Sequence, residues 1–132
     1  MLFRSLPYVN ALTDVTGFGL LGHLCEMCEG SGLSAEIEFS KVPKFDFLDT
    51  YIQQKSMPGG TQRNWDSYGK KIGSIGDLQR VILADPQTSG GLLVSVDADK
   101  TGEFEMFVEG KGHPLKPFGK LMPSESVFVR IR

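Results

Sequence analysis

The sequence predicts one α+β domain in which helices pack on a mixed β-sheet. Short apolar runs, some alternating with polar residues, predict strands, and longer runs with helical spacing predict helices. The two kinds of element do not alternate as a regular βα repeat, so a doubly wound sheet is not expected. At 132 residues, the chain has the length of one ordinary domain with one hydrophobic core.

The first half of the chain has two clear periodic segments. Apolar residues recur at helical spacing over residues 20–29 before a glycine-rich stop, which predicts a one-sided helix. Strict alternation of apolar and acidic residues over 35–39 predicts a strand with one buried face. Asp46 is expected to cap a short helix that ends at Gln53. Residues 57–69 are rich in glycine and polar side chains and lack periodicity, so a surface loop is expected there.

The second half mixes further helices and strands. Pro86 follows an apolar helical pattern and should end that helix, because proline disfavours helical geometry in the residue before it. The predicted elements are a helix over 77–84, a central strand over 92–96, a surface helix over 99–109, and strands around 116–121 and 126–131.

Composition narrows the function classes. The net charge of −2 lacks the basic excess that nucleic-acid backbones attract, so nucleic-acid binding is not expected. No run approaches the roughly 20 apolar residues of a membrane-spanning helix. The first residues also lack a signal-peptide pattern, so a cytoplasmic location without membrane association is expected.

Cys25 and Cys28 have C-x-x-C spacing but fall inside the predicted 20–29 helix. There is no second cysteine pair to complete a zinc site. A redox pair would normally lie at a helix amino terminus, where the thiolate is stabilised. Helix packing is therefore favoured over redox chemistry for both thiols.

Three segments concentrate residues that folding alone does not require: 13–19, 58–68 and 85–91. In the first, Asp14 precedes a Gly-x-Gly turn into the 20–29 helix, where backbone N–H groups can face an anion. Asp14 is suited to a hard cation such as magnesium, which binds phosphates through one or two carboxylates and water. The alternative is that Asp14, Thr13 or Thr16 only caps the helix.

The other two segments also leave two interpretations open. Arg63 and Asn64 could contact phosphate, or they could belong to a solvated loop. Trp65 and Tyr68 are favoured as loop anchors over a nucleobase-stacking surface. Residues 88–91 could form part of the site or only a turn that leads into a strand. For His23 packing is favoured over catalysis, and His113 is expected to be exposed.

The runs 11–23, 58–64 with 67–69 behind it, and 85–93 resemble, in this order, three segments of the carboxy-terminal domain of selenophosphate synthetases. The resemblance extends from about Ala11 to the end of the chain. The first ten residues match poorly and are expected to be a junction or leading segment. The domain assignment is therefore a carboxy-terminal domain over 11–132, with the amino-terminal nucleotide-binding domain absent.

The resemblance implies a fold similar to the carboxy-terminal domain of aminoimidazole ribonucleotide synthetase, in part ferredoxin-like. It implies an enzyme, selenide, water dikinase, that converts ATP, selenide and water into selenophosphate, AMP and orthophosphate with Mg²⁺. The product would serve selenoprotein and selenouridine synthesis, and the parent enzyme is expected to be a homodimer. Whether the parent uses cysteine or selenocysteine stays open, because the catalytic residue and its lysine have no counterpart here. The isolated chain is accordingly expected to be inactive.

Of the metal ligands that the resemblance implies, one maps onto Asp14. No catalytic residue is assigned, and Cys25 and Cys28 do not inherit that role. The residues expected to line a cleft or face phosphate are Thr13, Thr16, Gly17, Gly19, Thr61, Arg63, Asn64, Thr88, Ser89 and Gly90. The competing interpretations are another ATP-using member of the same superfamily and a stand-alone binding module.

Overall fold

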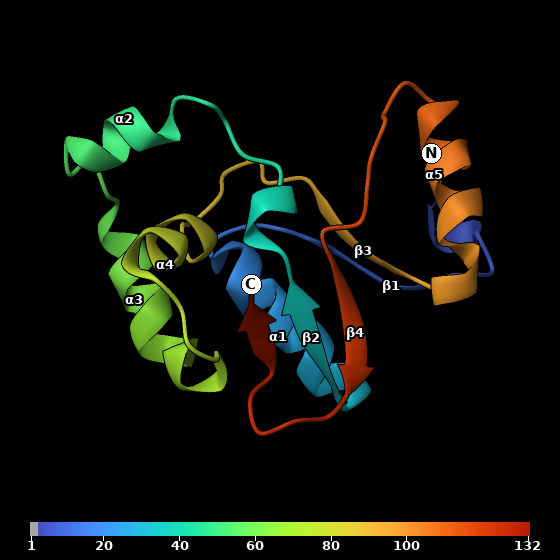
Figure 1. The fold of residues 1–132 in the computed structure, drawn as a ribbon, viewed down its shortest axis with the longest axis horizontal. Coiled ribbons are helices and arrows are strands. Elements are labelled where there is room, and N and C mark those ends of the chain that lie inside the picture. The colour runs from blue at the N-terminus through green and yellow to red at the C-terminus, as the bar shows by residue number, and fades with distance from the viewer. Residues whose placement is uncertain (1–2) are drawn as a thin grey trace.

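The computed structural model describes residues 3–132, and within them it contains five α-helices and five strands (Figure 1). The helices are α1 (Gly19–Ser31), α2 (Leu48–Gln53), α3 (Gly59–Tyr68), α4 (Asp77–Leu83) and α5 (Thr101–Glu109). The strands are β1 (Val9–Asp14), β2 (Leu33–Ile37), β3 (Leu92–Val96), β4 (Gly119–Pro123) and β5 (Val129–Ile131). None of the described helices is long and apolar enough to cross a bilayer.

The strands form two separate sheets. β1 and β3 pair antiparallel, and β2 lies between β4 and β5 in a second sheet. β2 runs antiparallel to β4 and parallel to β5, so this second sheet is mixed. Figure 1 shows α5 at one end of the molecule, with α2, α3 and α4 gathered at the other. The predicted α+β class with a mixed sheet is confirmed.

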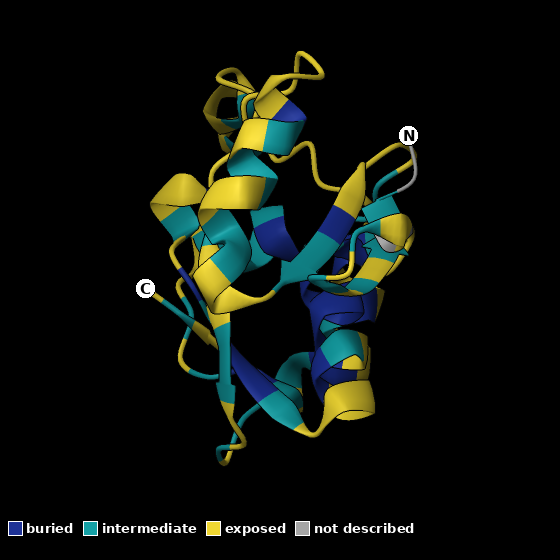
Figure 2. Cartoon of the chain, turned by 90° about the vertical axis from the view of Figure 1, so that its right-hand side faces the viewer, coloured by how far each residue is buried: buried dark blue, intermediate teal, exposed yellow. Residues whose placement is uncertain are grey.

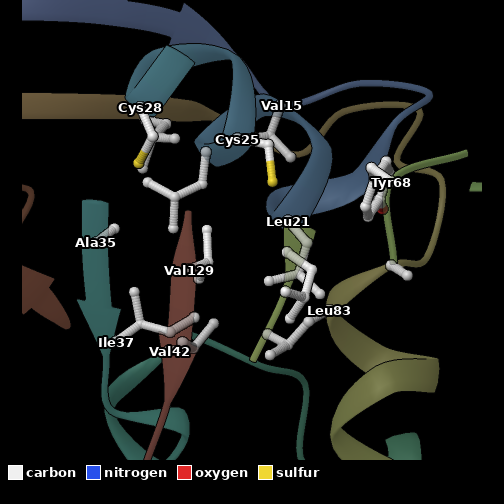
Figure 3. Packing of buried hydrophobic residues seen from close by; sticks show 14 residues of the cluster. Val15, Leu21, Cys25, Cys28, Ala35, Ile37, Val42, Tyr68, Leu83 and Val129 are labelled. Atoms are coloured by element: carbon white, nitrogen blue, oxygen red, sulfur yellow. The ribbon is translucent and has the colours of Figure 1, made fainter. Parts of the chain in front are cut away.

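Helix α1 lies at the centre of the core and contacts β2, β5, α3 and α4. Leu21, Leu24 and Cys28 are almost completely buried on it. They belong to one apolar cluster with Ile37 of β2 and Val129 of β5 (Figure 3). Figure 2 shows most of α1 as a buried element, while loops and other helix faces are exposed. A one-sided helix was predicted here, but α1 is covered on more than one side because α3 and α4 also pack on it.

The prediction of a loop over 57–69 is wrong, because most of this segment is helix α3. Its buried positions are Thr61, Asn64 and Tyr68, which recur at helical spacing. Two of these side chains are polar, so an apolar pattern could not reveal the helix. Trp65 is half-buried and packs against the core, and therefore anchors a helix and not a loop.

Other boundaries also differ from the predicted ones. Strand β1 was not predicted, and β4 and β5 are shorter and begin later than expected, although β5 ends at the predicted residue. Phe47 is the N-cap residue of α2 and no side chain caps that helix, so the proposed cap at Asp46 is wrong. The prediction for β3 matches the observed bounds, and the helices α4 and α5 lie within the predicted ranges.

Candidate functional site

The first and third motif segments lie side by side because the β1–β3 pairing continues beyond the strands. Asp14 is paired with Leu92 at the end of the ladder. Beyond it, the Val15 N–H donates to the Gly91 carbonyl at 2.9 Å, and the Gly90 N–H donates to the Val15 carbonyl at 3.2 Å. These hydrogen bonds place the segments 13–19 and 85–91 next to each other, although they lie far apart in the sequence.

Helix α3 fastens both segments from one side. The Asn64 side-chain amide donates to the carbonyl oxygens of Gly17 at 2.8 Å and Ala84 at 2.9 Å. The Thr61 hydroxyl donates to the Asp85 carboxylate at 3.1 Å. Both side chains are buried. All three segments selected from the sequence are therefore brought together, with Asn64 and Thr61 serving as the connections.

Two glycines make this close approach possible. Gly19 begins α1 with a φ of +70°, and a Cβ there would lie 2.8 Å from both the Ala84 carbonyl carbon and the Asp85 oxygen. A Cβ on Gly90 would lie 2.5 Å from the Val15 carbonyl oxygen. A side chain at either position would force the two segments apart.

The residue that precedes α1 is Phe18, and no side chain caps the helix. The capping alternative for Thr13, Asp14 and Thr16 is therefore excluded. The Thr16 hydroxyl instead lies 3.1 Å from Nε2 of His23. His23 is buried, as packing predicted, but its ring nitrogens both have polar partners.

The Asp14 side chain is exposed at the end of β1. Among residues 3–132, no ion pair or hydrogen bond engages this carboxylate, so its oxygens are available to a ligand. The same part of the chain contains no group of three or more His, Cys, Asp or Glu side chains arranged for a metal ion. Asp14 can thus supply one ligand to a cation, and any further ligands would have to come from other groups.

The remaining candidate residues divide into two kinds. Arg63, Thr88 and Ser89 are exposed, and Thr13 is half-buried on the opposite face of β1 from Asp14. Gly17, Gly19 and Gly90 shape the backbone of the turn, as do their hydrogen-bonded neighbours. The exposed side chains can meet a ligand directly, whereas the three glycines and their hydrogen-bonded neighbours hold the segments in place.

Asp85 and Gln87 were not among the predicted site residues, yet they connect its parts. Gln87 donates its backbone N–H to the Thr16 carbonyl at 3.0 Å and its side-chain amide to the Asp85 carboxylate at 3.0 Å. Burial raises the pKa of Asp85, and the hydrogen bonds from Thr61 and Gln87 oppose this effect. The sequence selected the 85–91 segment as a whole and marked Asp85-Pro86 as the end of a helix, but no signal distinguished the connecting role of Asp85 and Gln87.

Cys25 and Cys28 are free thiols buried in the core, as the packing interpretation predicted. Burial and the neighbouring Cys28 raise the pKa of Cys25 to about 12, and burial raises the pKa of Cys28 to about 11. Thiols with such values are protonated at neutral pH and are poor nucleophiles. His113 is exposed, also as predicted.

The family described as AIR synthase related protein, C-terminal domain, matches residues 4–132. The chain belongs to this family. The chain is also similar to proteins named selenide, water dikinase. It is 48% identical to the one from Colwellia psychrerythraea over 98% of the chain and 38% of that relative. It is 52% identical to the one from Aeromonas hydrophila over 90% of the chain and 34% of that relative.

This AIR synthase-related domain therefore spans about a third of the length of these curated relatives. A solved structure, thiamine-monophosphate kinase from Stenotrophomonas maltophilia, superposes on 94% of the chain with a TM-score of 0.55. The chain covers 31% of that structure, and the two sequences are 17% identical. At this identity the similarity shows a shared fold, in agreement with the fold expected from the motifs.

Proposed function

We propose that this chain is the carboxy-terminal part of a selenide, water dikinase. The observation that carries the proposal is the identity of about half of all residues to proteins of that name over nearly the whole chain. The longer enzyme would use ATP, selenide and water to form selenophosphate, AMP and orthophosphate. We further propose that it acts as a cytoplasmic homodimer and supplies selenium for selenocysteine synthesis.

The candidate site indicates which groups this chain would contribute to the reaction. Three segments converge on one exposed turn, and that turn presents the unpaired Asp14 carboxylate. Arg63, Thr88 and Ser89 are the exposed candidates for phosphate contact, because guanidinium and hydroxyl groups donate hydrogen bonds to phosphate oxygens. The catalytic nucleophile and the nucleotide-binding groups would come from the amino-terminal part of the longer protein.

The Asp14 carboxylate fits Mg²⁺ as a single protein ligand. Magnesium typically keeps several water molecules and is held by one or two carboxylates together with substrate phosphates. An exposed carboxylate without a cationic partner has the right donor chemistry for this role. When bound, the ion would neutralise charge on the phosphate groups, and Asp14 would hold it at the edge facing the rest of the enzyme.

The test is the measurement of AMP release from ATP, Mg²⁺ and selenide. The longer protein should release AMP only when selenide is present, and the 132-residue chain alone should release none above background. Omission of selenide is the control for ordinary ATP hydrolysis. AMP formation by the isolated chain, or the absence of selenide-dependent AMP from the longer protein, would contradict the proposal.

A further inference from the structure

Thr16, His23 and Glu26 form a continuous polar chain beside the candidate site. The Thr16 hydroxyl lies 3.1 Å from Nε2 of His23, and Nδ1 of the same ring lies 3.1 Å from the Glu26 carboxylate. Nothing in the candidate site described above gives this chain a function. The His23 residue is only 7% exposed, and its ring meets the Phe18 ring edge-on, with 5.8 Å between the ring centres. The ring therefore has a fixed place between the turn and α1.

The Glu26 carboxylate, at one end of this polar chain, determines the direction of its hydrogen bonds. An ionised carboxylate can only accept, so Nδ1 of His23 must carry the proton that is shared with Glu26. In a neutral ring, Nε2 is then unprotonated and must accept. The proton that it accepts can come only from the Thr16 hydroxyl. The hydroxyl proton is thereby directed toward the protein interior.

The position of Thr16 is fixed from its backbone as well. Its carbonyl oxygen accepts hydrogen bonds from the N–H groups of Gly19 and Gln87, both at 3.0 Å. The residue is exposed and lies two positions after Asp14. With its proton engaged by His23, the Thr16 oxygen offers only lone pairs to the surroundings. Lone pairs attract the water of a hydrated cation and repel phosphate oxygens.

We propose that His23 is a positioning residue that, held by Glu26, fixes Thr16 as a hydrogen-bond acceptor for the water shell of the divalent cation at Asp14. This inference rests on the proposed function for its cation and its reaction. In this proposal Thr16 accepts hydrogen bonds from the water molecules around the ion. The phosphate contacts are still made by Arg63, Thr88 and Ser89. His23 itself touches neither the cation nor the substrate.

The first test reads the tautomer of His23 in the 132-residue chain and requires no activity. Nitrogen-15 NMR of the imidazole rings at pH 8 should show His23 with a protonated Nδ1 and an unprotonated Nε2. Glu26→Ala should shift this ring toward the other tautomer. The chain has two histidines, and the exposed His113 serves as the internal reference that should not respond. A ring protonated at Nε2, alone or together with Nδ1, would contradict the hydrogen-bond directions proposed for Thr16, His23 and Glu26.

The second test is a magnesium titration of AMP formation by the longer protein. Thr16→Val and His23→Leu should raise the Mg²⁺ concentration for half-maximal rate about 2- to 10-fold, the usual effect of losing one hydrogen bond. Thr16→Ser and His23→Gln should leave the Mg²⁺ concentration for half-maximal rate unchanged. Serine keeps the hydroxyl group, and glutamine can accept a hydrogen bond from Thr16 and donate one to Glu26. Leucine fills a similar buried volume with an apolar side chain, so a packing role alone predicts normal magnesium dependence for His23→Leu.

The outcomes separate the two proposals. A folded His23→Leu or Thr16→Val enzyme with unchanged magnesium dependence would overturn the positioning role. A His23 ring protonated at Nε2, together with normal selenide-dependent AMP formation, would overturn the positioning role and leave the proposed function intact. Absence of that AMP formation from the unmodified longer protein would overturn the proposed function and the cation assignment together, even if the tautomer were as expected.

Discussion

The Tyr68 hydroxyl donates a 2.6 Å hydrogen bond to the backbone carbonyl of Phe18, at the point where the glycine turn becomes α1. Tyr68 is the last residue of α3, so this bond joins two helices that are 50 positions apart in the sequence at that point. The edge of its ring also lies against Gly22, where a Cβ would come within 2.9 Å of it. The turn that carries Asp14 and Thr16 is therefore held by side chains of α3, and not by its own sequence alone.

Tyr68→Phe should lower the free energy of unfolding by about 0.5–1.5 kcal/mol, because it removes this hydrogen bond and keeps the ring. Urea unfolding of the 132-residue chain measures the effect. Tyr51→Phe is the matched control, since Tyr51 is 51% exposed on α2 and should change stability by less than about 0.5 kcal/mol. Equal effects of the two substitutions would contradict the role given to Tyr68.

Gly19→Ala should destabilise the chain strongly. The positive φ alone costs about 1–2 kcal/mol for a residue with a Cβ. The new methyl would also lie 2.8 Å from backbone atoms of Ala84 and Asp85, which cannot yield without moving the 85–91 segment. Gly30→Ala is the control in the same helix, because outside the adjoining backbone of α1 no atom lies within 4 Å of its Cβ position. It should stabilise α1 by about 0.5–1 kcal/mol, and thermal or urea unfolding would show the opposite signs.

Stability should fall at alkaline pH because of the buried thiols. In the unfolded chain they lose protons near the ordinary pKa of 9.0, whereas in the fold the pKa is about 12 for Cys25 and about 11 for Cys28. Above pH 9 the folded state therefore binds more protons than the unfolded chain. The contribution of the protonated thiols to the free energy of unfolding is complete below pH 9 and is lost as pH rises toward 11. Burial raises the pKa of Tyr68 in the same direction.

The expected slope is at most about 1.4 kcal/mol per pH unit for each thiol. Urea unfolding at a series of pH values from 8 to 10 would measure it. Cys25→Ala should reduce the slope, since it removes one of the two thiols whose pKa is raised in the fold. A free energy of unfolding that stays constant across this range would show that the thiols are not buried as described.

The sequence predicted the elements whose buried residues are apolar and periodic. The β3 strand was predicted over its observed bounds, and α1 was recognised from Leu21, Leu24 and Cys28. Helix α3 was missed because its buried face consists of Thr61, Asn64 and Tyr68. Their hydrogen-bond acceptors, one carboxylate and otherwise backbone carbonyls, lie 20 or more positions away in the sequence. A period search that counts apolar residues cannot detect such a face.

The site was predicted in the same partial way. Its three segments were recognised, but the sequence could not show which residues reach a ligand and which ones hold the backbone. Asn64 was expected to line a cleft or face phosphate, and the structure shows that its amide connects Gly17 and Ala84. The polar partners of the buried His23 also depend on how the turn folds back on α1, so they could not be derived from spacing alone.

Asp14→Asn in the longer enzyme should lower turnover about 10-fold or more, or require more Mg²⁺, because Asn keeps the size of the side chain but removes the charge that we propose binds the cation. The substitution should change the free energy of unfolding by less than about 0.5 kcal/mol, since Asp14 is exposed and does not cap α1. AMP formation across a magnesium titration, together with thermal unfolding, tests both statements. Asp77→Asn is the control, because its carboxylate is 96% exposed on α4 and pairs only weakly with Arg80. Normal kinetics in a folded Asp14→Asn enzyme would remove Asp14 from the metal site, whereas a kinetic defect at unchanged stability that Asp77→Asn lacks would support it.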